Sequence, residues 1–243
     1  MKSNPLVTII TPTTGHTKLK QALDSVKVQT YSNIQHLIVI DGEQPVDANL
    51  LTQYSQADVL ALPYNTGAGG FNGHRIYGAC TYLAKGDYLM FLDEDNWIDN
   101  THIESLVDII QQGNQWAYSL RKIISPEDRF ICNDDCESLG MWPSVLNDFF
   151  IDVGCWFVSK HIALVMSPFW YRRARHPDDQ PEVDRIISRF LLNNGYRYGC
   201  TGLYTLNYRV GNRKDSVQSN FFLQGNALMR QQYPETFPWR KNR

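Results

Sequence analysis

Three consecutive carboxylates directly after an apolar run are the residues best placed to do chemistry in this chain. Residues 88–92 are apolar, and Asp93, Glu94 and Asp95 follow at once. Such a run is typical of a central strand, and carboxylates crowded at its end repel one another unless a cation lies between them. Mg²⁺ and Mn²⁺ prefer oxygen ligands and take one or two protein carboxylates together with substrate phosphates. The Asp-x-Asp spacing therefore predicts a site for a metal-bound diphosphate; the alternative is an acidic turn in which Asp95 or Asn96 caps the next helix.

Composition limits the classes of protein that the chain could be. Its 243 residues suit one α/β domain, and a net charge of −2 gives no basic field for nucleic acid. The five cysteines are odd in number and scattered, which favours free thiols in a reducing compartment. The first residues run straight toward a strand without a secretory signal, so we expect a cytoplasmic protein.

Strands alternate with helices along the first half of the chain. Apolar runs predict strands over 7–11, 34–40, 59–62 and 88–92, and helical spacing predicts helices from Thr17, with Val28 on the inward face, and over 75–84. This alternation predicts an α/β fold with a mostly parallel sheet and helices on both faces. Ligands of such sheets bind beyond the carboxyl ends of the strands.

Four candidate segments fall at those carboxyl ends. They are Thr11, Asp41, the glycine-rich stretch 65–73 and the carboxylates 93–95. The glycine-rich stretch has neither the Gly-Lys-Ser/Thr of a Walker loop nor the Gly-x-Gly-x-x-Gly of a dinucleotide fold, and alone it would be a flexible surface loop. The convergence of all four favours a binding site over a set of unrelated turns.

The order of short motifs resembles the start of family 2 glycosyltransferases of the GT-A fold. The motifs are Val-Thr-Ile-Ile-Thr-Pro-Thr at 7–13, Ser-Val-x-x-Gln-Thr-Tyr-x-Asn at 25–33, Ile-Asp-Gly at 40–42, Arg-x-x-Gly at 75–78 and Phe-Leu-Asp-Glu-Asp at 91–95. The resemblance is strong over residues 6–97 and weak afterwards. One departure is Ile40-Asp41, where the family usually has paired aspartates. The resemblance implies a single GT-A domain over 1–243, with a nucleotide-sugar half at 1–97 and an acceptor half with a C-terminal tail at 98–243.

The resemblance also implies roles for individual residues. Asp41 would accept a hydrogen bond from the base or ribose, Asp93 would face the ribose, and Asp95, with Asp93, would ligate Mn²⁺ or Mg²⁺. The other residues expected around the donor are Thr11, Pro12, Thr13, Gly67, His74, Arg75 and Glu94. Taken alone, Thr11 could simply end a strand and Arg75 could be a solvated cation.

The second half offers candidates for the acceptor side and for a base. A strand is predicted over 152–158, interrupted by Gly154. Trp156 or Trp142 is a candidate for stacking on a sugar ring; the alternative is that both are core aromatics. Inverting transfer needs a carboxylate to take the proton of the attacking hydroxyl. Asp184, which opens an apolar helix, matches the family's position best, and Asp179 is the competitor. Favourable charge at a helix start explains part of this acidic cluster.

Two polar segments complete the analysis. Residues 211–216 follow a predicted strand over 203–210 and could form a lid that brings Arg213 or Lys214 to the diphosphate, or a solvated loop. The basic, aromatic stretches 171–175 and 239–243 could touch an anionic membrane near a lipid-linked acceptor, with solvated charge as the simpler explanation.

The resemblance thus implies a metal-dependent, inverting glycosyltransferase of polysaccharide biosynthesis. Its donor would be a nucleotide-diphospho-sugar, most simply UDP-linked, and its acceptor a hydroxyl of a saccharide or lipid-linked saccharide. The rivals are an inactive nucleotide-sugar-binding module and a sugar-phosphate nucleotidyltransferase. The second would need an arginine after the first strand, which residues 11–16 lack.

Overall fold

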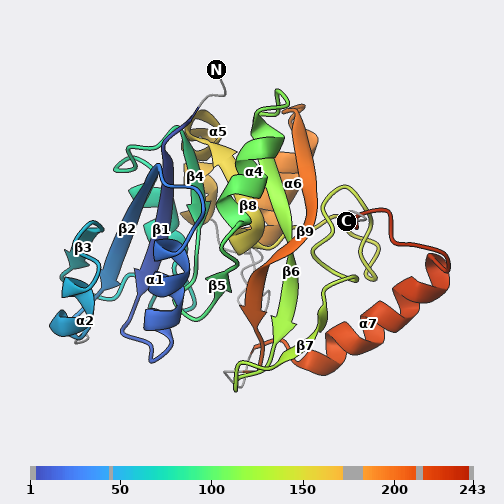
Figure 1. Cartoon of the computed structure of the whole chain (residues 1–243), viewed down its shortest axis with the longest axis horizontal. Helices are drawn as coiled ribbons and strands as arrows, with labels where there is room; N and C mark the ends of the chain where they lie inside the picture. The colour runs from blue at the N-terminus through green and yellow to red at the C-terminus, as the bar shows by residue number, and fades with distance from the viewer. Residues whose placement is uncertain (1–3, 44–45, 172–182, 212–215, 241–243) are drawn as a thin grey trace.

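The computed structural model describes residues 4–43, 46–171, 183–211 and 216–240, and within them nine strands form one sheet in the order β3-β2-β1-β4-β8-β6-β9-β5, with β7 paired to β6 (Figure 1). The strands are β1 (Val7–Thr13), β2 (Ile34–Asp41), β3 (Asp58–Leu62), β4 (Tyr88–Phe91), β5 (Trp97–Ile98), β6 (Trp116–Ile124), β7 (Phe130–Asn133), β8 (Trp156–Ser159) and β9 (Tyr198–Arg209).

The strand directions bring most carboxyl ends to one edge of the sheet. β1 pairs in parallel with β2 and β4, and β2 with β3. β8 is antiparallel to both β4 and β6, so β6 points the same way as β4, and β9 is parallel to β6. The predicted α/β class is confirmed, and the antiparallel pairs of the second half make the sheet mixed.

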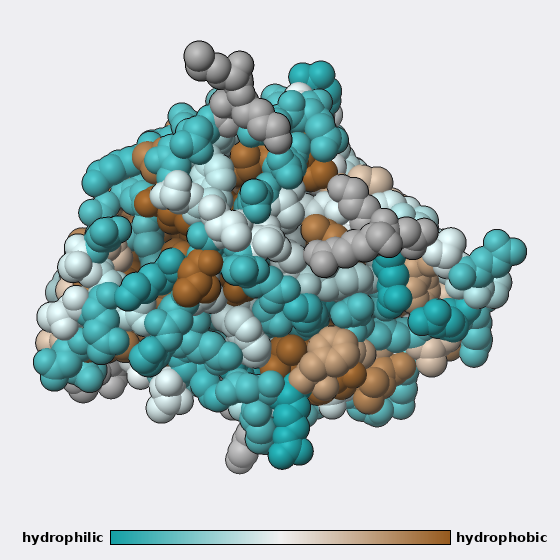
Figure 2. Space-filling model, in the orientation of Figure 1, coloured by the Kyte–Doolittle hydropathy of each residue, from teal (hydrophilic) through white to brown (hydrophobic). Residues whose placement is uncertain are grey.

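Helices cover both faces of this sheet. They are α1 (Leu19–Lys27), α2 (Ala48–Thr52), α3 (His74–Cys80), α4 (His102–Ile110), α5 (Lys160–Met166), α6 (Val183–Asn193) and α7 (Ser219–Gln232), with 3-10 turns η1 (Val153–Cys155) and η2 (Ser167–Tyr171). In Figure 1, α1 and α4 lie in front of the sheet and α5 and α6 behind it. No helix in the described part of the chain has the length and apolar character needed to cross a bilayer. The face in Figure 2 is mostly hydrophilic, with hydrophobic residues in separate patches.

Three local predictions need correction. Pro12 does not end the first strand, because β1 runs to Thr13 with Pro12 opposite Val39. Val28 is 61% exposed rather than inward-facing, since α1 ends at Lys27. The strand predicted over 152–158 begins only at Trp156, because Asp152 accepts a hydrogen bond from the Gly154 N–H (3.0 Å) and starts the turn η1.

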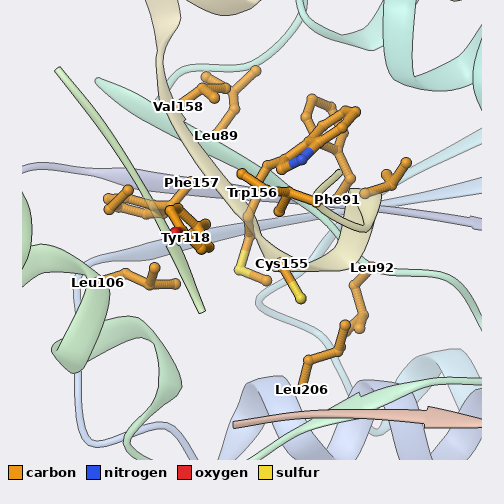
Figure 3. Packing of buried hydrophobic residues seen from close by; sticks show 14 of the residues in the cluster. Leu89, Phe91, Leu92, Leu106, Tyr118, Cys155, Trp156, Phe157, Val158 and Leu206 are labelled. Carbon is orange, nitrogen blue, oxygen red and sulfur yellow. The ribbon is translucent and has the colours of Figure 1, made fainter. Parts of the chain in front are cut away.

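The core lies between β4, β6 and β8 and the helices on either side. Figure 3 shows Leu89 and Phe91 of β4 packed with Trp156, Phe157 and Val158 of β8, all fully buried. The Phe91 and Trp156 rings meet edge to face with centroids 6.5 Å apart. Trp156 is thus a core aromatic, and its predicted contact with sugar is wrong.

Two buried histidines make the fold sensitive to acid. The His36 imidazole hydrogen-bonds the Thr11 hydroxyl (2.9 Å), and that of His102 the Thr205 hydroxyl (2.7 Å). Burial lowers the pKa of each from 6.5 to about 4. Between these values the unfolded chain binds more protons than the folded one, so stability falls as pH drops below 6.5.

We therefore predict that each of these imidazoles lowers the free energy of unfolding by about 2 kcal/mol when the pH falls from 7.5 to 5, because it binds a proton more readily in the unfolded chain. His36→Gln should reduce that pH-dependent loss by about this amount, measured by urea unfolding at the two pH values. The exposed His161 is the control, and His161→Gln should leave the loss unchanged. An equal loss in wild type and His36→Gln would contradict the assignment.

Candidate functional site

A cavity of about 570 Å³ opens at the carboxyl edge of the sheet. Its walls come from the ends of β1, β2 and β9, from the turns after β3 and β4, and from the start of α3. The predicted site residues that line it are Pro12, Thr13, Asp41, Gly67, His74, Asp93, Glu94 and Asp95. Segments far apart in the sequence thus meet where the parallel strands end, as the α/β prediction requires.

Glu94 holds the end of β1 rather than facing the cavity with free oxygens. Its carboxylate accepts hydrogen bonds from the Thr13 hydroxyl (2.5 Å), the Thr14 N–H (3.1 Å) and the His16 N–H (3.0 Å). These donors occupy most of its acceptor capacity. Glu94 therefore shapes the turn after β1 and has little left to offer a ligand.

Asp41 organises the glycine-rich loop. Its Oδ1 accepts from the Thr66 N–H (2.6 Å) and hydroxyl (2.8 Å), and its Oδ2 accepts from the Gly67 N–H (3.0 Å). A Cβ at Gly67 would lie 2.4 Å from the Asn72 carbonyl oxygen, so the loop closes on itself only with glycine there. Asp41 lines the cavity, and its role toward a base or ribose stays a prediction.

The carboxylate of Asp93 accepts fewer hydrogen bonds than those of Asp41 and Glu94. Burial, followed by the charge of Asp95, raises the pKa of Asp93 to about 7, although a hydrogen bond from the Tyr77 hydroxyl (2.5 Å) opposes this rise. Tyr77 is itself buried and packs against Phe91 and Trp170. Asp93 and Asp95 thus lie together in the cavity beyond the end of β4, and the cation expected between them stays a prediction.

The acidic turn does not cap the next helix. Helix α4 begins at His102 with Thr101 as its N-cap, and β5 lies between it and Asp95. The Asn96 side-chain oxygen instead accepts the Arg209 N–H (2.9 Å), and the Arg209 guanidinium donates to the Asp95 carbonyl. The helix-cap alternative for this motif is wrong.

The donor set fits a hard divalent cation. Two carboxylates one residue apart repel each other in a cavity, and oxygen ligands are what Mg²⁺ and Mn²⁺ prefer. Within the described ranges, no group of three or more His, Cys, Asp or Glu side chains is arranged to hold a metal. A cation here would therefore need further ligands from water and substrate, which is the usual state of Mg²⁺.

Thr11 and Arg75 do not line the cavity. Thr11 is fully buried against His36. The Arg75 guanidinium lies 3.4 Å from the centre of the Phe71 ring and donates to the Thr66 carbonyl (3.1 Å). Thr11 thus pairs with β2 through His36, and Arg75 holds the glycine-rich loop through Thr66 and Phe71.

His74 is the most distinctive polar group of the wall. Burial lowers the pKa of its imidazole to about 4, so the ring is neutral at physiological pH. Its Nδ1 is buried and has no hydrogen-bond partner among the described residues. A neutral ring with a free nitrogen can serve a ligand as donor or acceptor, depending on its tautomer.

Asp184, the predicted base, does not line the cavity. Burial raises the pKa of its carboxyl, and the hydrogen bond from the Arg185 N–H (2.8 Å) opposes the rise. Burial also raises the pKa of Asp152, with a smaller contribution from the charge of Asp184, and Val153 beside Asp152 lines the cavity. The competitor Asp179 falls outside the described residues, as do Arg213 and Lys214.

A buried arginine holds this side of the site together. Arg121 of β6 is 1% exposed and donates to the carboxylates of Asp134 (2.8 Å), Glu137 (2.5 Å) and Asp152 (2.5 Å). Glu137 also accepts from Arg185 (2.8 Å) at the start of α6. This chain of ion pairs fixes the turn before η1 and the helix that carries Asp184 relative to the sheet.

Several cavity residues were missed from the sequence. The main ones are Thr14, Tyr77, Asn96, Val153, Tyr208 and Arg209, whereas Asn65, Asn72 and Ser216 fall in the predicted candidate segments 65–73 and 211–216. Arg209 had an available signal, because it lies at the carboxyl end of the predicted strand 203–210. Tyr77 had none, since a tyrosine inside a helix looks like any other core aromatic. Trp142, the other sugar-stacking candidate, packs against Trp239 with ring centroids 6.0 Å apart.

The chain belongs to glycosyl transferase family 2, whose model matches residues 8–173. It is 30% identical over 101 residues to the glycosyltransferase GlyA of Streptococcus pneumoniae, a match that covers 41% of this chain and 14% of that protein. It is 29% identical over 116 residues to the uncharacterized glycosyltransferase RT0329 of Rickettsia typhi, covering 46% and 35%. The chain thus spans less than half of the length of these relatives.

Solved structures show the same fold. Residues 1–349 of S. aureus TarS superpose with a TM-score of 0.63 at 13% identity, covering 84% of this chain and 60% of that one. The complex of the same fragment with UDP-GlcNAc gives 0.62, covering 95% and 67%. At this identity the likeness shows the GT-A fold and no more.

We predict that Tyr77→Phe destabilises the protein by about 1.5–3 kcal/mol, because it removes a hydrogen bond to a buried charged group while keeping the ring packing. Urea unfolding at pH 8, where Asp93 is ionised, measures the change. Tyr82→Phe, at a ring 64% exposed, is the control and should change stability by less than about 0.5 kcal/mol. Equal stability of both variants would mean that the Tyr77–Asp93 contact contributes nothing.

Proposed function

We propose that this chain is a metal-dependent glycosyltransferase that moves a sugar, with inversion, from a nucleotide-diphosphate donor to a hydroxyl acceptor. The observation that carries the proposal is that Asp93, whose pKa burial raises to about 7, and Asp95 both line the cavity at the carboxyl edge of a family 2 chain. UDP is the favoured donor nucleotide, supported by the TarS structures in complex with UDP and with UDP-GlcNAc. A saccharide or lipid-linked saccharide is the proposed acceptor.

Asp95 and Asp93 would hold Mn²⁺ or Mg²⁺, which when bound offsets the negative charge that develops on the departing diphosphate. Tyr77 donates to one oxygen of Asp93 (2.5 Å), and the Asn96 amide makes only a long hydrogen bond (3.5 Å) to the other oxygen, which would be the one to meet a cation. Asp41 would act through the glycine-rich loop that it orders, and His74 would offer its free ring nitrogen to the donor.

Asp184 would accept the proton of the attacking hydroxyl. A general base works best when its pKa lies near the working pH, and burial raises the pKa of Asp184 in that direction. Asp179 stays the alternative base.

The two rival functions are less well supported. A nucleotidyltransferase would need an arginine after the first strand, and residues 11–16 contain none. Hydroxyl and N–H groups of this segment bind Glu94 instead. An inactive binding module would have no need for a buried carboxylate with a raised pKa beside the cavity. Donor hydrolysis, measured with and without Mn²⁺, separates the enzyme from the binding module.

We predict that Asp95→Asn abolishes the additional rise in melting temperature that Mn²⁺ gives in the presence of UDP. A ligand at 100 times its Kd stabilises the native state by about 2.7 kcal/mol, so the loss is measurable. Asp108→Asn, at an exposed position of α4, is the control and should keep the rise. An unchanged rise in Asp95→Asn would remove Asp95 from the metal site.

We further predict that Asp184→Asn lowers the release of UDP from its UDP-sugar by roughly 10²–10⁴-fold, as expected for loss of a positioned proton acceptor. UDP affinity should stay near wild type, because the base meets the acceptor. Normal turnover in Asp184→Asn together with a collapse in Asp179→Asn would move the role to Asp179. Normal turnover in both variants would mean that neither aspartate is the base, and that the acidic cluster only provides favourable charge at the start of the helix.

A further inference from the structure

The turn that carries Asp93 and Asp95 crosses between two strands that are not neighbours. In the sheet, β4 and β5 are separated by β8, β6 and β9, yet only residues 92–96 join them along the chain. The near end of the turn is held on β1, where the Leu92 N–H donates to the Ile10 carbonyl (3.0 Å). Its far end depends on β9, because β5 is two residues long and β9 is its partner in the sheet.

Arg209, at the end of β9, holds this far end of the turn by two hydrogen bonds. Its backbone N–H donates to the Asn96 side-chain oxygen (2.9 Å), and its guanidinium donates to the Asp95 carbonyl. The second bond is made to the proposed metal ligand itself. The backbone from which the Asp95 carboxylate extends is therefore fixed by this arginine.

The guanidinium is itself held from several elements. Its Nη2 donates to the Gln21 side-chain oxygen of α1 (2.7 Å) and to the carboxylate of Asp128, in the hairpin between β6 and β7. Strands β6 and β9 are parallel and end side by side in Figure 1, which brings this hairpin to the end of β9. The guanidinium also lies 4.9 Å from the centre of the Trp97 ring, and the side chain is 1% exposed. Such a locked side chain can hold a neighbouring ligand group in one geometry.

Two other roles for Arg209 fit the contacts less well. Its Nε is buried without a hydrogen-bond partner among the described residues, and an unpaired buried donor lowers stability. Stability alone therefore does not account for an arginine here. Arg209 also lines the cavity, so direct contact with a diphosphate is the second alternative. Its Nη atoms already donate to Asp95, Gln21 and Asp128, which favours a role through the turn.

We infer that Arg209 is a positioning residue for the metal site: it holds residues 95–96 so that the Asp95 carboxylate meets the cation, and it does not itself bind the donor. The inference rests on the proposed function, since it concerns the same cation and the same diphosphate. It adds a residue from the second half of the chain to a site whose carboxylates come from the first half.

The test is calorimetric titration of UDP into the protein, once with Mn²⁺ and once with EDTA. In Mn²⁺, Arg209→Ala should weaken UDP binding by roughly 10–100-fold, the usual effect of losing an outer-shell partner of a metal ligand. In EDTA the variant should match wild type, because no metal is bound there. Arg209→Lys should lose as much as Arg209→Ala, since one ammonium group cannot make all the donations of the guanidinium.

A second variant tests the same connection away from the cavity. Gln21 does not line the cavity, and Gln21→Ala removes one partner of the guanidinium. It should weaken UDP binding in Mn²⁺ by a smaller factor. The double variant with Arg209→Ala should lose no more than Arg209→Ala alone, because the two residues act through one contact. If urea unfolding shows that Arg209→Ala does not fold, Gln21→Ala and Arg209→Lys decide.

Arg230→Ala is the matched control. The Arg230 guanidinium also lies over an aromatic ring, 4.6 Å from the centre of Phe237, but it does not line the cavity. This variant should bind UDP like wild type both in Mn²⁺ and in EDTA.

Three results would overturn the inference: wild-type UDP affinity of Arg209→Ala in Mn²⁺, an equal loss of affinity in EDTA, or recovery of binding in Arg209→Lys. The last two would indicate direct contact with the phosphates, which a lysine can also make. If Mn²⁺ increases the UDP affinity of wild type and of Arg209→Ala alike, only the role of Arg209 fails. If Mn²⁺ has no effect on wild type, the proposed metal site fails, and the positioning role fails with it.

Discussion

Negative charge buried at one edge of the sheet is the constraint on which the rest of this structure depends. Parallel strands bring their carboxyl ends together, and in this chain carboxylates follow several of those ends. A carboxylate away from water is costly unless it is paired or hydrogen-bonded. Asp41 and Glu94 meet this need with N–H and O–H groups of neighbouring turns, and Arg121 meets it for three further carboxylates. The loops around the cavity are therefore shaped largely by the need to solvate these groups.

Asp93 shows where that compensation stops. Tyr77 supplies one hydrogen bond, while burial and the nearby charge of Asp95 still hold the pKa of Asp93 near 7. Glu94, between them in sequence, also lines the cavity, but the turn after β1 occupies most of its acceptor capacity. Consecutive residues of one turn thus differ in role, because Glu94 holds the turn while the carboxyl of Asp93 is left with a raised pKa. A divalent cation would offset the negative charge of Asp93 and Asp95, which is the reason for proposing a metal-bound diphosphate there.

The first half of the fold could be predicted from sequence because each strand carries its own apolar signal and ends in a polar residue of distinct type. That logic found Asp41 and the carboxylates at 93–95, and it correctly placed them at one edge. It failed where a contact between distant segments decides the outcome. Pro12 stays in a strand because β2 pairs alongside it, and Thr11 turns from the cavity toward His36. Residue type and spacing do not contain such information.

The second half depends on ion pairs that no periodicity reveals. Arg121 and Arg185 share Glu137, which ties β6 to the start of α6 and so sets the position of Asp184. Breaking a buried pair of this kind costs about 3–5 kcal/mol, because the remaining charge is left without a partner. Asp148 then extends the connection along the helix from Arg185 to Arg189. The cavity is therefore defined by strand ends, and helix α6 is anchored to the sheet through buried charge. A substitution at Arg121 or Glu137 would displace the proposed base with its helix, because these ion pairs hold the start of α6 against β6.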